Sequence, residues 1–141
     1  MSATIIPEEE MRAVAFSSLL YANGFFQTFE KSMSSEKSRF DRDLLYNFAV
    51  MSLEKYFVAL LARYDWNASH HMPVALFREA LPFENDLTVS MKQTAILVGK
   101  FEAICSLDGF GYHTPTMEEL QLMVSGISEI KILVEKRLTE I

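Results

Sequence analysis

Apolar residues recur along most of this chain at steps of three and four, the spacing that places them on one face of an α-helix. The first such pattern follows Pro7 and the acidic run at 8–10, and both features favour a helix N-terminus. The polar stretch 34–37 interrupts the pattern, so we expect the first helix to end there. Its buried face is predicted to consist of Met11, Val14, Ser18, Tyr21, Phe25 and Phe29.

A second apolar pattern opens at Phe40 and runs to about Tyr64 without a clear polar side. A helix that is apolar all round lies at the centre of a bundle or in a subunit interface. The segment 44–62 is long enough to suggest a membrane span, but Glu54 and Lys55 stand at its middle and favour a buried core helix. We therefore predict no membrane contact and a central helix whose apolar surface exceeds what one small bundle hides.

Two further helices are indicated by prolines and a possible cap. A short helix is predicted over 70–80, because Pro73 lies near its first turn and Pro82 just beyond its end. A fourth helix is predicted to begin with Asp86 as its cap and to end at the glycine-containing segment 109–111. Its apolar face is expected to carry Met91, Ala95, Val98, Phe101 or Glu102, and Cys105.

The last helix has the clearest start signal in the chain. The Thr116 hydroxyl and the Glu119 side chain are spaced to form a capping box. The apolar positions that follow at helical steps are Leu120, Val124, Ile127, Val134, Leu138 and Ile141. Because no segment is predicted as a strand, the expected fold is all-α: an up-and-down four-helix bundle with one additional short helix, in a single domain covering 1–141.

Three glycines, Gly24, Gly99 and Gly126, fall inside predicted helices, where each costs about 1 kcal/mol relative to alanine. Close approach of two helices is the favoured reason for them, since a missing Cβ lets backbones pack tightly. A functional kink is the alternative.

Composition excludes several classes of protein. The chain has 141 residues, a net charge of −6 and one cysteine, Cys105. One cysteine supports neither a disulfide framework nor a multi-thiolate zinc site, and the acidic balance argues against a broad nucleic-acid surface. No basic and apolar leader is evident at the start of the sequence, so we expect a cytoplasmic protein. No cofactor and no metal are indicated.

Few residues are candidates for chemistry. His70 and His71 are adjacent and would point about 100° apart on a helix, so they cannot both bind one metal ion. His113 lies in a predicted loop, where binding a ligand is an alternative to a structural role. Glu54, Lys55 and Arg63 carry charges within an apolar helix, which predicts an interhelical ion-pair network. The alternative is a groove for a partner or a nucleotide phosphate, with Arg63 as a planar phosphate fork.

The stretch 47–61, with its alanine, Glu54-Lys55 and Ala59-Leu60-Leu61, resembles the central helix of HEPN domains, small helical modules named for nucleotide binding in higher eukaryotes and prokaryotes. The histidine before Pro73 is similar to the one that opens the short third helix of that family. The resemblance implies a helical domain that forms a homodimer, binds a nucleotide or accompanies a nucleotidyltransferase partner.

Many HEPN domains are metal-independent RNases that use an arginine, four to six residues, and then a histidine, commonly on a later helix at a dimer interface. Here six residues separate Arg63 from His70, but the pair spans the predicted end of the second helix and the loop beyond it. We therefore expect a non-catalytic, dimeric binding domain. The alternative is an RNase of toxin–antitoxin type using Arg63 with His70 or His71, and capture of a small ligand between helices is a third hypothesis.

Overall fold

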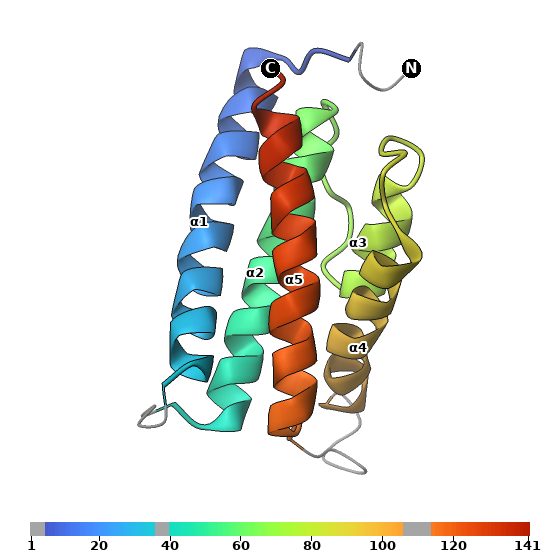
Figure 1. The fold of residues 1–141 in the computed structure, drawn as a ribbon. Helices are drawn as coiled ribbons and strands as arrows, with labels where there is room; N and C mark the ends of the chain where they lie inside the picture. Colours follow the sequence, from blue (N-terminus) through green and yellow to red (C-terminus); the bar gives the residue numbers. More distant parts are fainter. Residues whose placement is uncertain (1–4, 36–39, 106–113) are drawn as a thin grey trace.

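The computed structural model describes residues 5–35, 40–105 and 114–141, the side chains of 102–105 excepted. Within these ranges the chain is helical and contains no strand: α1 (Glu9–Met33), α2 (Arg42–Arg63), α3 (Pro73–Ala80), α4 (Val89–Cys105) and α5 (Met117–Leu138). The four long helices run alternately down and up, and the short α3 packs against α2 and α4 (Figure 1). The predicted fold class, a helical bundle with one additional short helix, is confirmed.

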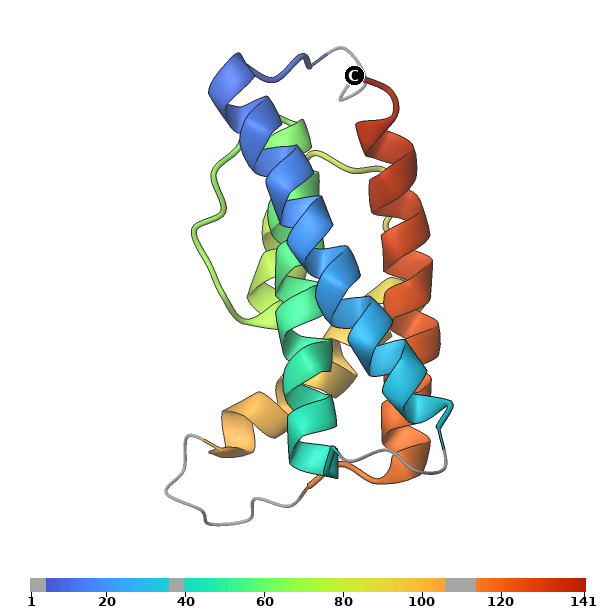
Figure 2. The same ribbon diagram turned by 90° about the vertical axis from the view of Figure 1, so that its left-hand side faces the viewer.

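Helix α2 is the central helix of the bundle. It packs against each of the other four helices (Figure 2). Twelve of its residues are buried, including Arg63 at its C-terminal end. Among the described helices α2 alone is long and apolar enough to cross a membrane, but more than half of its most apolar window lies buried inside the fold. It is therefore the core helix of the bundle.

The neighbours of α2 also correct one prediction. Its apolar surface is not in excess of what the chain can hide, because Leu44 and Met51 are its only large hydrophobic side chains in the exposed class. The other helices cover the rest. Most of the exposed large hydrophobic side chains in the described structure lie outside α2.

Helix α1 turns to the core a face that differs in part from the one predicted. The buried residues are Ala15, Ser18, Ala22, Phe26, Phe29 and Met33. Tyr21, expected inside, is 61% exposed. The small side chains of Ala15 and Ala22 let α1 and α2 lie close together along most of their length. The prediction was correct for Ser18 and Phe29, which are buried, and wrong for Tyr21.

The helix starts confirm one predicted cap, correct a second and add a third that was not predicted. In α5 the Glu119 amide donates to Thr116 Oγ1 at 3.1 Å, and the Thr116 amide donates to Glu119 Oε1 at 2.9 Å, as predicted. Helix α4 begins at Val89 and not after Asp86, because Thr88 accepts from the Met91 amide at 3.1 Å. Helix α2 is capped by Asp41, which the sequence analysis missed. The predicted end of α4 at 109–111 lies outside the described residues.

The short helix also starts later than predicted. Its first residue is Pro73, whose missing amide hydrogen costs nothing at this position, so His70 and His71 lie in the preceding loop.

The glycines inside helices have different surroundings. At Gly126 a Cβ would lie 2.0 Å from Thr94 Oγ1, so α4 and α5 approach closely there, as expected. At Gly99 the nearest atom, Val74 Cγ2, would be at an ordinary contact distance of 3.7 Å. At Gly24 nothing lies within 4 Å, so close packing does not account for that glycine.

Candidate functional site

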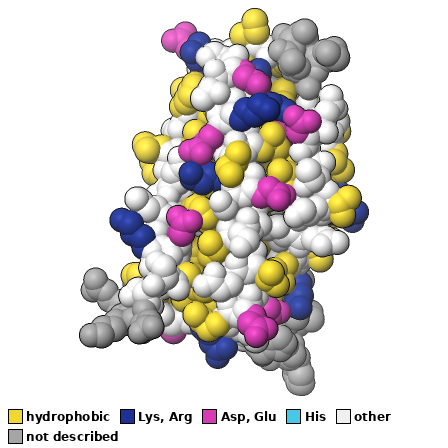
Figure 3. Space-filling view, viewed as in Figure 1, with side chains coloured by type: hydrophobic (Ala, Val, Ile, Leu, Met, Phe, Trp, Pro, Cys, Tyr) yellow, Lys and Arg dark blue, Asp and Glu magenta, His cyan; other side chains and the backbone are white. Residues whose placement is uncertain are grey.

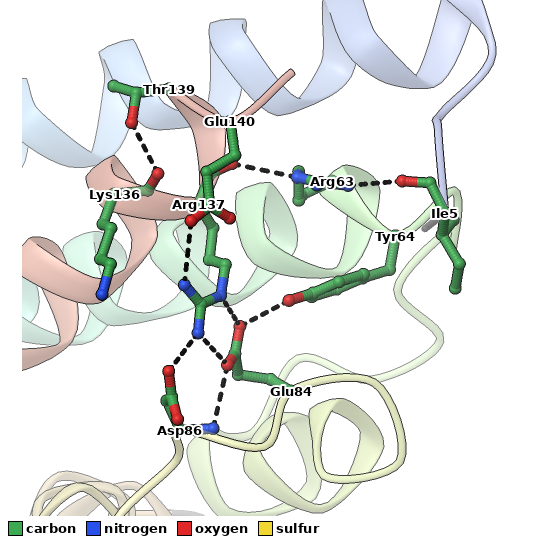
Figure 4. A network of polar contacts seen from close by, with 9 residues as sticks. All are labelled: Ile5, Arg63, Tyr64, Glu84, Asp86, Lys136, Arg137, Thr139 and Glu140. Carbon is green, nitrogen blue, oxygen red and sulfur yellow. Dashed lines mark hydrogen bonds and ion pairs between the residues drawn. The ribbon is translucent and has the colours of Figure 1, made fainter. Parts of the chain in front are cut away.

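Arg63 joins three segments of the chain by hydrogen bonds at one end of the bundle. Its side chain is buried, with the residue 2% exposed. Nε donates to the carbonyl of Arg137 at 3.0 Å and Nη1 donates to the carbonyl of Ile5 at 2.7 Å (Figure 4). The guanidinium carbon lies 5.2 Å from the centre of the Tyr64 ring, within the range of a cation–π contact. These contacts tie the end of α2 to α5 and to the segment before α1.

Beside Arg63 lies a hollow of about 370 Å³. It is lined by Ile5, Ile6, Pro7, Arg12, Arg63, Glu140 and Ile141. The lining carries two guanidinium groups and one carboxylate on otherwise apolar walls. Arg63 forms no further hydrogen bond with a described residue.

A second set of buried charges lies next to Arg63, and the sequence analysis missed most of it. Glu84, in the connection between α3 and α4, is 2% exposed. Its carboxylate accepts hydrogen bonds from Arg137 Nε at 2.7 Å and from Arg137 Nη2 at 2.9 Å (Figure 4). It also accepts from the Tyr64 hydroxyl at 2.7 Å and from the Asp86 amide at 3.0 Å. Arg137 also pairs with the Asp86 carboxylate. We call Tyr64, Glu84, Asp86 and Arg137 the end cluster.

The end cluster shifts the ionisation of its members. Burial opposes the charge on Glu84, but hydrogen bonds from Arg137, Tyr64 and the Asp86 amide outweigh it and lower the pKa of Glu84. Burial and the hydrogen bond to Glu84 raise the pKa of Tyr64 to about 12. The hydrogen bond to Glu84 raises the pKa of Arg137. The charges of the end cluster are therefore paired with one another. The cluster has a structural role, because it joins the connection between α3 and α4 to the C-terminal ends of α2 and α5.

His70 lies against the short helix α3. Its Nδ1 is 2.9 Å from Glu79 Oε1, while the Trp66 indole nitrogen and the Ser69 amide both donate to Glu79 Oε2 at 2.8 Å. The Glu79 side chain is largely buried, which raises its pKa, but these three hydrogen bonds outweigh burial and lower the pKa to about 2. Glu79 thus holds the loop between α2 and α3 along α3.

His71 occupies a separate, exposed position. Its Nδ1 lies 3.0 Å from Glu54 Oε2, on the side of α2. Lys55 forms no hydrogen bond or ion pair with a described residue, and Arg63 donates only to main-chain carbonyls. Within the described ranges none of the three forms an ion pair with another helix, so the predicted interhelical ion-pair network is wrong; Glu54 instead pairs with His71 in the loop before α3.

The predicted site residues do not converge in the described structure. No hydrogen bond or ion pair joins Arg63 to either His70 or His71 within the described ranges. His113 lies outside the described residues. The described part of the chain also holds no group of three or more histidine, cysteine or acidic side chains that could bind a metal ion.

One side of α5 is not covered by any other described element; α5 lies toward the viewer in Figure 1. Six exposed residues run along its outward side: Glu118, Leu122, Ser125, Glu129, Ile132 and Lys136. We call them the α5 outer face. Leu122 and Ile132 are 62% and 64% exposed, although the core is complete without them. On this side of the molecule, hydrophobic side chains are exposed among acidic and basic ones (Figure 3).

Two hollows adjoin the α5 outer face. One, of about 380 Å³, lies between α4 and α5 above the close contact of Thr94 with Gly126. The other, of about 450 Å³, lies along the N-terminal half of α5. Leu122 and Ser125 line both. The surface is thus grooved as well as apolar.

Comparison with known proteins adds no further assignment: the chain matches no protein-family model, no curated protein and no solved structure. The candidate site therefore depends on its own geometry.

Proposed function

We propose that this chain is a HEPN-like helical interaction domain that works as a homodimer and not through catalysis, with the α5 outer face as its contact surface. The observation that carries this proposal is the exposure of Leu122 and Ile132 on one side of α5, where Leu122 lines two hollows. Large apolar side chains grouped on one helix and next to grooves mark interaction surfaces more often than scattered single ones do.

The environment of Arg63 favours binding over RNA cleavage. A nuclease would need Arg63 to stabilise charge on a phosphate and a histidine to move the proton. Arg63 is buried and donates to two main-chain carbonyls, while His70 is held by Glu79. The net charge of −6 also disfavours RNA.

The HEPN part of the proposal draws on where the resembling stretch falls. It lies on α2, whose Ala49, Ala59, Leu60 and Leu61 are buried at the centre of the bundle. A nucleotidyltransferase partner, nucleotide binding and a cytoplasmic location follow from the resemblance and the composition, and they belong to the proposal on those grounds alone.

Light scattering of the purified protein over about 5 to 200 µM tests the proposal. We expect a concentration-dependent rise toward twice the chain mass of 16.1 kDa. Leu122→Asp should weaken association about tenfold or more, because it places a charge in the apolar part of the interface. Ile6→Asp is the matched control, since Ile6 is even more exposed but lies outside the α5 outer face. A monomer at every concentration would contradict the proposed dimer.

Incubation with RNA tests the alternative. We expect no cleavage by the wild-type protein. If the protein cleaves RNA, and both Arg63→Ala and His70→Ala abolish cleavage while keeping the helical circular dichroism spectrum, the non-catalytic assignment is wrong.

A further inference from the structure

The α5 outer face has the spacing of a helix-pairing seam. Its members follow one another at steps of four, three, four, three and four residues, an average of 3.6. That is the period of the α-helix itself, so all six residues lie on one stripe against which a second helix can pack. All six are exposed, and no element of the described chain covers them.

The order of residues in this seam is complementary to its own reverse. Glu118, Leu122 and Ser125, read toward the C-terminus, stand opposite Lys136, Ile132 and Glu129, read toward the N-terminus. An acid therefore meets a base, an apolar side chain meets another, and a hydroxyl meets a carboxylate. Two-fold symmetry produces this kind of matching, because residue i of one copy contacts residue j of the other and j contacts i.

We infer that the partner of the α5 outer face is a second copy of this chain, whose α5 packs antiparallel to the first around a two-fold axis that passes between Ser125 and Glu129. The inference rests on the proposed homodimer and specifies its geometry. Leu122 of each copy packs against Ile132 of the other, next to the hollows that Leu122 lines. Glu118 of each copy pairs with Lys136 of the other, which gives two ion pairs about 27 Å apart along the helices.

The charges at the two ends of the seam are available for this pairing. Neither Glu118 nor the Lys136 ammonium forms an ion pair with a described residue. Glu129 Oε1 accepts from the hydroxyl of Thr88, just before α4, at 3.2 Å, which leaves Glu129 Oε2 for the Ser125 hydroxyl of the other copy. A parallel arrangement would instead place Glu118 against Glu118 and Lys136 against Lys136, and this repulsion selects against it.

Charge reversal across the seam tests the pairing directly. Glu118→Lys and Lys136→Glu each turn two attractive contacts into repulsive ones, so each should raise the dimer dissociation constant about tenfold in sedimentation measurements at low salt. The double variant restores both pairs in the opposite sense and should return to within about threefold of wild type. Glu10→Lys, an equal charge reversal on α1, should leave the constant unchanged.

Cysteine cross-linking reads the direction of the two helices. In a Cys105→Ser background, mixing Leu122→Cys with Ile132→Cys protein should give a disulfide-linked heterodimer on mild oxidation. Either protein alone should stay uncross-linked, because the ten-residue offset between the two positions corresponds to about 15 Å along the axis, beyond disulfide reach. Cross-linking of each protein with itself would indicate parallel helices and overturn the inference.

The outcomes separate this inference from the proposed function. A dimer whose dissociation constant ignores both charge reversals, and whose mixed cysteines do not cross-link, overturns the antiparallel pairing but leaves the homodimer standing. A protein that stays monomeric at all concentrations overturns both. Unchanged melting temperatures of the charge variants would show that their effects arise in the dimer and not in the fold.

Discussion

The end cluster and the α5 outer face both carry charged side chains, but the two regions differ in their exposure to water. In the end cluster, Glu84 and Arg137 are withdrawn from water and use their hydrogen-bonding groups on each other and on neighbouring segments. On the α5 outer face, Glu118 and Lys136 are exposed and have no ion-pair partner among the described residues. The comparison teaches that the buried charges of the end cluster hold the fold together, whereas these two exposed charges contribute no ion pair to it.

Removing a buried charge should give the largest effect on stability. Glu84→Ala removes the buried acceptor of Arg137 and of the Tyr64 hydroxyl and leaves Arg137 with only the exposed carboxylates of Asp86 and Glu140, so the free energy of unfolding should fall by about 3 kcal/mol. Urea denaturation followed by circular dichroism measures this loss. Glu118→Ala is the control, with an expected change within about 0.5 kcal/mol. Equal losses in the two variants would remove the distinction between the regions.

The packing under the α5 outer face gives the next largest effect. Gly126→Ala introduces a Cβ that meets Thr94, so we expect a loss of about 1 to 3 kcal/mol in spite of the better helix propensity of alanine. Gly24→Ala meets open space and should stabilise α1 by up to about 1 kcal/mol. Thermal unfolding of the two variants gives both signs, and a stabilising Gly126→Ala would mean that α4 and α5 are not held close.

How far the sequence predicted each region follows from the range of the interactions. Periodicity predicted the helices and the central position of α2, since both depend on neighbours three and four residues apart. The Thr116 capping box was found for the same reason. Glu84 and Arg137 are 53 residues apart, and no local pattern connects them. Asp86 was singled out, but for a local role as a helix cap, when its carboxylate pairs with Arg137.

The α5 outer face was missed for a different reason. The sequence analysis followed apolar residues that define a core, so the mixed stripe through Leu122 and Ile132 carried no signal. Only the burial of the other faces of α5 shows that this stripe remains uncovered. The expectation of a surplus apolar surface on α2 was wrong for the complementary reason, because its neighbours cover it.

Another largely buried charge, Glu79, makes part of the stability of the fold depend on pH. Its pKa is about 2 in the folded protein against an ordinary 4.5, so the folded state favours the ionised form. That contribution to stability is present in full above about pH 4.5 and is lost as the pH falls toward 2. Glu79→Gln should cost about 1 to 2 kcal/mol at pH 7, and the difference from wild type should shrink with falling pH. Urea unfolding at several pH values measures it, and a difference that stays constant with pH would contradict this assignment.

The smallest effect on stability is expected at the α5 outer face, and it sharpens the comparison most. Lys136→Glu places an acid near the C-terminal end of α5, where the helix dipole disfavours it by about 0.3 to 1 kcal/mol. Glu118→Lys places a base in the first turn, with a similar small cost. Both variants should therefore unfold almost as wild type does under conditions where the protein is monomeric, while their dimer dissociation constants shift. If the charge reversals instead lowered the stability of the monomer as much as Glu84→Ala does, the outer-face charges would belong to the fold, and the contrast between a fastening and a binding surface would not hold.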